Sequence, residues 1–182
     1  MIAYTYYERD PRVRREAEAL VKANYSVHVI ALKDKKQSYK ETKLGVNIFR
    51  LPISKHRGGK LTYIASYLFF FILTFFWVSV LHLKNHYSVI HVHNMPNFLV
   101  FSAILPKLFG IPIILDVHDP MPELFGSIFS EADLLFDKTL LFEERISFGF
   151  ADTLITVHKG MFDLLTSRGT DPNKFYAFHN LP

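Results

Sequence analysis

The chain has no cysteine among its 182 residues, so neither a disulfide framework nor a zinc site built on thiolates is possible. It also lacks the glycine-rich patterns that hold phosphates. No G-x-G-x-x-G follows the first strand-like segment and no Walker A motif occurs, so neither a dinucleotide site nor a P-loop is indicated. No serine or cysteine lies on a nucleophile elbow.

A secretory signal is missing as well, because Met1 runs directly into a strand-like segment without a basic stretch or a cleavage site. We therefore expect a cytoplasmic protein. The formal net charge of +4 is too small to indicate a nucleic acid partner. Apolar residues make up 49% and charged residues 21%, which is typical of a globular domain. The 18 phenylalanines exceed the needs of one core, so some aromatic surface is expected to contact lipid or a partner.

Short β-prone runs alternate with helical patterns along the whole chain. Seven runs predict strands, at Ile2–Tyr7, Ser26–Leu32, Val46–Leu51, Ser88–His93, Ile111–Val117, Thr153–Val157 and Lys174–Phe178. Helices are predicted after Asp10, which is a natural N-cap before Pro11, and over Leu61–Leu83, Phe98–Phe109, Leu134–Phe148 and Met161–Arg168. The lysine-rich stretch Lys33–Lys43 predicts a solvated loop.

This alternation is typical of βαβ units with right-handed crossovers. The strands are continuous apolar runs, which indicates that helices cover both of their faces. We therefore predict an α/β fold with a Rossmann-like, doubly wound, mostly parallel seven-stranded sheet, in a single domain over residues 1–182. The chain stops directly after a predicted strand, as expected at a domain boundary.

In an open parallel sheet, ligands bind beyond the carboxyl ends of the strands. Four of the nine histidines follow predicted strands, which favours a shared cleft over a simple start of polar sequence. The residues predicted to line that cleft are Asp10, Arg12, His93, Asn94, His118, Asp119, Glu123, His158 and Lys159, and His179 and Asn180 follow the last strand.

His118 and Asp119 are the most informative pair. They end an apolar strand, and Pro120 and Pro122 after them predict a stiff loop that holds both side chains in place. A histidine beside a carboxylate can act as an acid, a base or a phosphate ligand, although Asp119 could equally cap a turn. His91 and His93 lie two apart on a strand, but a third ligand at convincing spacing is missing, so no metal is expected.

The apolar segment Leu61–Leu83 carries no formal charge, and as a helix of roughly 35 Å it could span a bilayer core of about 30 Å. A membrane span would place the third and fourth strands on opposite sides of the membrane, where they could not share a sheet. We therefore favour a helix that lies in the interface of an anionic membrane, over a buried helix or a true span. The residues expected to contact the membrane are Phe70, Phe71, Trp77, Lys55, Arg57 and Lys60.

Several motifs resemble one known family when they are taken in order. They are the run from Val89 to Asn94, the run from Ile113 to Glu123 and the run from Phe150 to Val157. The opening from Tyr7 to Ala17 and the close from Lys174 to Asn180 are also similar to a bacterial branch. Nearly the whole chain thus resembles the N-terminal domain of glycosyltransferase family 4, which has the two-domain GT-B fold.

The resemblance implies an acceptor-binding domain that faces a separate nucleotide-sugar-binding domain, with transfer that retains the anomeric configuration and uses no metal. His118 matches the active-site histidine that faces the transferred sugar, and Asp10 and Arg12 match the first loop lining the cleft. Tyr6-Tyr7-Glu8-Arg9 replaces the Gly-Gly pair of many members, which puts donor contact through that loop in doubt.

The family branch often builds exopolysaccharide, O-antigen or capsule on a lipid-linked saccharide. We therefore expect a hexosyltransferase peripheral to the inner face of the plasma membrane, with the donor domain absent from this chain and the chain alone inactive. An alternative is a non-catalytic, membrane-recruiting or acceptor-binding subunit of a split glycosyltransferase. A third, weaker reading is an unrelated doubly wound domain that binds a small phosphorylated ligand.

Overall fold

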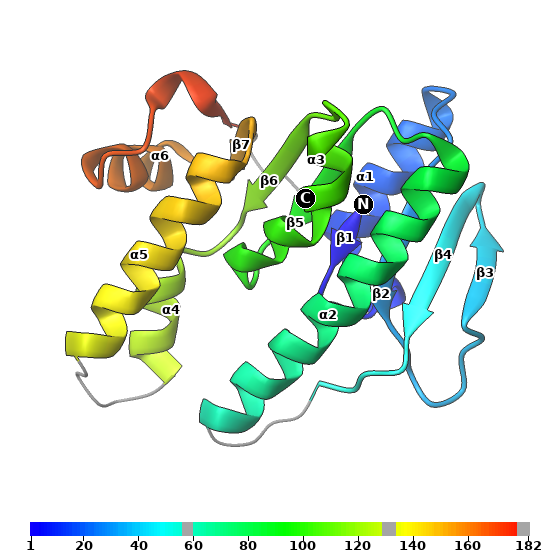
Figure 1. Cartoon of the computed structure of the whole chain (residues 1–182), viewed down its shortest axis with the longest axis horizontal. Helices are drawn as coiled ribbons and strands as arrows, with labels where there is room; N and C mark the ends of the chain where they lie inside the picture. Colours follow the sequence, from blue (N-terminus) through cyan, green and yellow to red (C-terminus); the bar gives the residue numbers. More distant parts are fainter. Residues whose placement is uncertain (56–59, 129–133, 178–182) are drawn as a thin grey trace. The chain divides into compact units, whose positions relative to one another are not determined.

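The computed structural model describes residues 1–55, 60–128 and 134–177, which form an α/β fold (Figure 1). The chain divides into two compact units, Met1–Trp77 and Val78–Pro182. The helix α2 (Lys60–Asn85) contains the boundary between them. Each unit is built on hydrogen-bonded strands with helices in the connections between them.

In the first unit the strand order is β3-β4-β2-β1. These strands are β1 (Ile2–Ala3), β2 (His28–Leu32), β3 (Lys40–Lys43) and β4 (Val46–Leu51), and the unit also contains the 3-10 helix η1 (Tyr7–Arg9), α1 (Pro11–Lys22) and the first part of α2. β1 and β4 both pair with β2 in parallel, whereas β3 pairs with β4 in an antiparallel hairpin. The core of this unit packs α1 on the strands through residues such as Val13, Ala17, Val29 and Ile48.

In the second unit the order is β5-β6-β7-β8, and these neighbouring strands pair in parallel. The strands are β5 (Ile90–His93), β6 (Ile113–Val117), β7 (Thr153–Thr156) and β8 (Phe175–Ala177). The helices are η2 (Asn97–Ala103), α3 (Ile104–Leu108), α4 (Met121–Ile128), α5 (Leu134–Phe150), α6 (Lys159–Ser167) and η3 (Pro172–Lys174). Val92, Leu115 and Leu154 are fully buried, as the continuous apolar strands predicted.

The predicted doubly wound, mostly parallel Rossmann-like fold is confirmed, but the described residues form eight strands instead of seven. The additional strand is β3, inside the stretch predicted as a loop. Leu44 and Gly45 both have positive φ, at 49° and 82°, and make the tight two-residue turn that returns β3 to β4. All four residues of β3 are exposed, so this edge strand has no hydrophobic pattern to reveal it.

Two further predictions are corrected by proline placement. The predicted helix Phe98–Phe109 is a 3-10 helix followed by α3, and Pro106 falls in the first turn of α3, where its missing N–H is not needed. The predicted stiff loop at Pro120–Glu123 is the start of α4, with Pro122 at its second residue. His118 and Asp119 remain in the loop before this helix.

Candidate functional site

The first strand-end loop of the first unit leads into α1. The Asp10 carboxylate caps that helix, accepting from the backbone N–H groups of Arg12 at 3.2 Å and Val13 at 3.5 Å. The Arg12 Nε lies 3.5 Å from the same carboxylate. Asp10 and Arg12 therefore lie together at the start of α1, and the N-cap prediction is confirmed with Pro11 as the first helical residue.

Arg50, near the carboxyl end of β4, is a charged residue that the sequence reading missed. Its guanidinium is buried and pairs with Glu8 and Glu41, and it also donates to the Ser38 carbonyl oxygen at 3.0 Å. Burial favours a higher pKa for Glu8, but its hydrogen bonds and the charge of Arg50 lower the net pKa. These ion pairs tie η1 to β4 and β3 beside the strand ends.

The second unit gathers three imidazoles around one buried carboxylate. The Asp116 Oδ2 atom lies 3.1 Å from His118 Nε2, 3.3 Å from His93 Nδ1 and 3.8 Å from His91 Nε2. The rings of His93 and His118 are nearly parallel, with their centroids 5.7 Å apart. We call these four residues the Asp116 cluster. It forms because β5 and β6 are parallel neighbours that place His93 directly beside Asp116.

The charges of the Asp116 cluster follow from its burial. Burial alone would raise the pKa of Asp116, but hydrogen bonds from His118, His91 and His93 lower the net pKa well below its usual range. Burial lowers the pKa of His93 to about 3, with His91 acting in the same direction and Asp116 opposing. The cluster therefore holds a permanent anion beside a neutral His93 at physiological pH.

Asn94 joins the ends of β5 and β6. Its Oδ1 accepts from the His118 backbone N–H at 2.9 Å, and its Nδ2 donates to the Asp119 carbonyl oxygen at 2.6 Å. The Asn94 backbone N–H also donates to the Asp116 carbonyl oxygen at 2.9 Å. Four predicted site residues, His93, Asn94, His118 and Asp119, are therefore brought together at one sheet edge.

A family profile described as "Glycosyl transferase 4-like domain" matches residues 10–180 of this chain. The chain belongs to that family. The resemblance to glycosyltransferase family 4 drawn from the motifs is thus confirmed.

Solved structures agree with the fold of this glycosyltransferase domain. A domain of a sucrose-phosphate synthase from Thermosynechococcus elongatus superposes with a TM-score of 0.64 at 18% identity, covering 98% of this chain and 87% of that one. A longer sucrose-phosphate synthase chain from the same organism gives 0.61 at 17% identity, and this chain spans 47% of its length. At such identities the likeness shows the fold alone. A comparison with curated proteins finds no match.

The remaining predicted cleft residues of the glycosyltransferase domain have other contacts. His158 caps α6, with its Nδ1 accepting from the Met161 N–H at 3.1 Å, and Lys159 pairs with Asp163 at 3.0 Å. Glu123 pairs with Arg168. Among the residues that the structure describes, no hydrogen bond or ion pair joins these side chains to the Asp116 cluster. His179 and Asn180 lie outside the described residues.

Metal ligation within the Asp116 cluster is geometrically feasible. His91, His93 and Asp116 each offer a ligand atom, and these atoms lie within 4.8 Å of one another. Imidazole nitrogen with carboxylate oxygen is a donor set that suits zinc or non-haem iron. The sequence had suggested only the two histidines of this set. Asp116, which lies within β6 two residues before His118, could have been found from that spacing.

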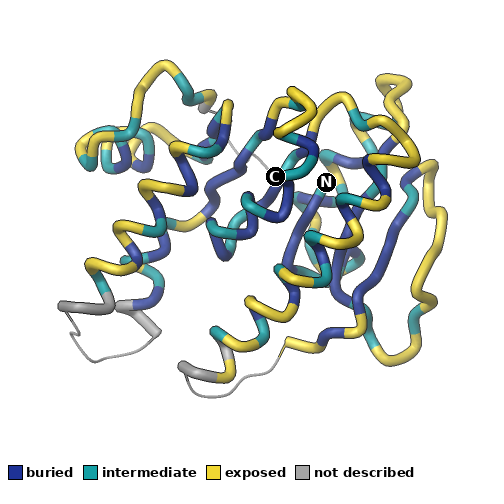
Figure 2. The backbone as a smooth tube through the Cα atoms, viewed as in Figure 1, coloured by how far each residue is buried: buried dark blue, intermediate teal, exposed yellow. Residues whose placement is uncertain are grey.

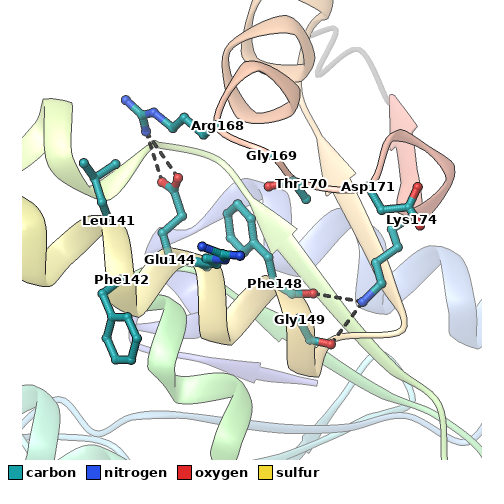
Figure 3. A pocket seen from close by; sticks show the side chains of 11 residues that line it. Leu141, Phe142, Glu144, Phe148, Gly149, Arg168, Gly169, Thr170, Asp171 and Lys174 are labelled. Atoms are coloured by element: carbon teal, nitrogen blue, oxygen red, sulfur yellow. Dashed lines mark hydrogen bonds and ion pairs between the residues drawn. The ribbon is translucent and has the colours of Figure 1, made fainter.

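A separate pocket of about 550 Å³ lies beside the C-terminal half of α5 (Figure 3). Arg168 on its wall donates to both Glu144 carboxylate oxygens, at 3.2 and 3.3 Å. The Lys174 Nζ donates to the carbonyl oxygens of Phe148, Gly149 and Ala151 at the end of α5. Gly149 precedes β7 and Lys174 precedes β8, so the pocket lies at the amino ends of these strands. None of the predicted site residues lines it.

The residues predicted to contact a membrane divide between the two sides of α2. Phe70 was predicted to face lipid, but it is fully buried, because its ring packs edge-on against Tyr4 at 5.1 Å between centroids. Trp77 is 43% exposed, and Lys55 is exposed as well. Phe71 is partly buried. Arg57 lies outside the described residues, as does the side chain of Lys60.

Proposed function

We propose that this chain is the acceptor-side domain of a retaining glycosyltransferase that moves a sugar from a nucleotide-sugar donor to a lipid-linked saccharide. The pathway would be cell-envelope or exopolysaccharide synthesis at the inner face of the plasma membrane. Membership of the family supports the transferase class. The observation that carries the proposal is the setting of His118 in the Asp116 cluster.

His118 is held by one ring nitrogen and offers the other. Its Nε2 lies 3.1 Å from the Asp116 carboxylate, so an N–H at Nε2 can donate to that carboxylate, and in this tautomer Nδ1 carries a lone pair. The Nδ1 atom is buried, and the described part of the chain supplies it with no hydrogen-bond partner. A buried acceptor of this kind fits a sugar hydroxyl, which would donate to Nδ1 when the substrate is bound.

Asp116 would also assist as charge develops. The transferred sugar becomes positively charged in the transition state of glycosyl transfer. A fixed carboxylate and imidazoles already oriented by it require little rearrangement during the reaction, so they can stabilise that charge electrostatically. Positioning of the acceptor by the domain would supply the remaining advantage. The donor would be bound by a second domain, as in the two-domain members of the fold class.

The lipid part of the proposal rests on α2. Within this helix, large apolar side chains recur every three or four residues on an exposed face, at Phe69, Ile72, Phe76, Val80 and Leu83. We call this the exposed apolar face of α2. It continues over more than half the helix, and buried and exposed stretches alternate along α2 in Figure 2.

The part of α2 from Ile64 to Asn85 is long and apolar enough to cross a membrane, and 28% of an apolar 18-residue stretch within it is buried inside the protein. Its buried residues share the opposite face, and they include Tyr67, Phe70 and Thr74 in the first unit and Val78, Leu81 and His82 in the second. A helix anchored along one face and apolar along the other suits an interfacial position, in the plane of the membrane. Lys55 before it and the exposed Lys84 within its last turn would meet anionic headgroups.

Sugar transfer is the test of this function. The chain with its donor domain would be supplied with nucleotide-linked hexoses and a polyprenyl-diphosphate-linked saccharide, and the product would be identified by mass spectrometry. Replacing His118 by Ala should lower turnover by about 100-fold, as for loss of one preorganised transition-state contact. The matched control is His86→Asn, at an exposed histidine with a φ of 51° that asparagine tolerates. Unchanged turnover in the His118 variant would rule out its role, and transfer only to water-soluble saccharides would rule out the lipid-linked acceptor.

A further inference from the structure

A carboxyl group on α5 is connected to the His118 loop by hydrogen bonds. Glu143 is partly buried, and its Oε1 accepts from the Ser147 hydroxyl at 3.1 Å. Its Oε2 accepts from the Asn97 side-chain amide at 3.2 Å, across the contact between α5 and η2. Sequence analysis gave no reason to single out Glu143, because one glutamate in a helix is usually a solvated residue.

The connection continues through two asparagines. The Asn97 Oδ1 accepts from the Asn94 Nδ2 at 3.2 Å, and Asn97 itself is 1% exposed. Asn94 in turn holds His118 by its backbone N–H and Asp119 by its carbonyl oxygen. Glu143, Asn97 and Asn94 therefore form an unbroken chain of hydrogen bonds from α5 to the segment that carries His118. We call it the Glu143 chain.

The Glu143 chain fixes the orientation of both of its side-chain amides. Asn97 is buried and uses its donor group toward Glu143 and its acceptor oxygen toward Asn94. Rotating this amide by half a turn would place its NH2 group against the Asn94 NH2 group and its oxygen against the Glu143 carboxylate, so both hydrogen bonds would be lost. Asn94 is fixed in the same way, since its acceptor oxygen meets an N–H and its amide meets two oxygens. The orientation of the Glu143 chain therefore fits an ionised Glu143, whose two carboxylate oxygens both accept, from Asn97 and from Ser147.

We propose that Glu143 is a positioning residue for the His118–Asp119 segment and acts on it through Asn97 and Asn94. Calling this segment part of an active site rests on the proposed function, whereas the connection itself does not. Protonation of Glu143 weakens this anchor, because a neutral carboxyl oxygen accepts a weaker hydrogen bond from the Asn97 amide than a carboxylate does, and a proton on Oε2 would oppose that amide directly. His118 would then be held less firmly in its place beside Asp116.

Protonation of Glu143 falls within the physiological pH range. Burial raises its pKa to about 7, with Asn97, Ser147 and the Phe98 backbone N–H opposing the shift and Glu144 adding to it. The 3-10 helix η2, which packs against α5, has no titratable side chain over residues 97–103. Among the described residues, the charged groups that other elements bring to α5 include Glu123 on α4, Arg168 after α6, which pairs with Glu144, Lys174, which binds carbonyl oxygens at the end of α5, and Lys107 on α3, whose Nζ lies 4.9 Å from the centroid of the Phe150 ring.

The experiment is an NMR titration of the whole chain from pH 5.5 to 8.5. It follows the side-chain amides of Asn97 and Asn94 and the backbone amide of His118. All three resonances should show a component with an inflection near pH 7, and Glu143→Gln should remove that component from all three. Titrating histidines shift nearby resonances in both proteins, so the difference between the two titrations isolates Glu143. The control is Asp163→Asn, which removes an exposed carboxylate of α6 and should leave the inflection unchanged.

A second variant tests Asn97, the middle residue of the Glu143 chain. With Asn97→Ser, the Glu143 carboxyl carbon should still titrate near pH 7, while Asn94 and His118 should no longer follow it. A titration that is the same in Glu143→Gln as in the unchanged protein, or a difference between the two that reaches Asn97 but neither Asn94 nor His118, would overturn the proposal. These readouts require no sugar transfer. A protein that passes them and transfers no sugar would contradict the proposed function alone.

Discussion

Phe69 and Phe70 are neighbours on α2, yet they should differ greatly in their contribution to stability. Phe70 is 0% exposed and lies edge-on to Tyr4, whereas Phe69 is 51% exposed. Phe70→Ala removes a fully buried ring and leaves a cavity, which typically costs about 3–5 kcal/mol, and the lost aromatic pair is included in this range. Phe69→Ala should cost less than about 1 kcal/mol, because half of that side chain already meets water and alanine favours the helix.

The measurement is urea unfolding of both variants, followed by the fluorescence of Trp77, the single tryptophan. It reports on this unit, since its ring lies 5.9 Å from that of Phe49. For a chain of this size, a loss of about 4 kcal/mol corresponds to a fall in Tm of roughly 10 °C. Equal losses for the two variants would refute the assignment of one buried and one exposed face to α2.

Three further predictions concern sites outside α2. Glu143→Gln should leave the free energy of unfolding unchanged near pH 4 and raise it by up to about 3 kcal/mol at pH 8. The reason is that a carboxyl group whose pKa in the folded state is raised to about 7 makes the folded state progressively less stable as pH rises from about 4.5 to 7. Urea unfolding at several pH values tests this, and a difference between the two proteins that does not change with pH would contradict it. Arg168→Ala should destabilise the domain by about 3 kcal/mol at pH 7, since it leaves the buried Glu144 without its cation. A free energy of unfolding, measured by thermal unfolding, that stays within about 1 kcal/mol of the unchanged protein would count against that ion pair. Gly45→Ala should lower the free energy of unfolding by about 1–3 kcal/mol, because the φ of 82° disfavours alanine and the added Cβ would lie 2.6 Å from a Val21 methyl group. An unchanged midpoint of urea unfolding would disprove the turn geometry.

The sequence predicted the parallel strands well because these strands are short, continuous and apolar, and turn residues separate them. It missed β3, whose exposed polar residues are recognised only by their pairing with β4. It also placed Phe70 toward lipid, because a segment that is apolar on every side carries no periodic signal for its buried face. The two faces of α2 became distinguishable only when Tyr4 and its neighbours were seen to pack on one of them.

The candidate site was predicted in part for a similar reason. Position after a strand correctly grouped His93, Asn94, His118 and Asp119, because parallel strands end at the same edge. The same rule also selected His158 and Lys159, whose contacts are local to α6. Asp116 was missed because it lies within a strand, before the polar residues begin. Residues of the Glu143 chain come from sequence positions about 50 apart, so only the packing of α5 on η2 reveals them.

The central claim, a glycosyltransferase domain that works at a lipid surface, is tested most directly by sedimentation with vesicles. The chain would be mixed with vesicles of phosphatidylcholine alone or with added phosphatidylglycerol, beside a variant with Phe69, Phe76 and Val80 changed to Ser. A matched control would carry Ser at Leu108, Phe142 and Tyr176, which are large hydrophobic residues on other elements and at least as exposed. The account predicts that the unchanged chain and the control bind the anionic vesicles, whereas the folded α2 variant stays in solution. Binding that survives in the α2 variant, or an unchanged chain that ignores both kinds of vesicle, would contradict it.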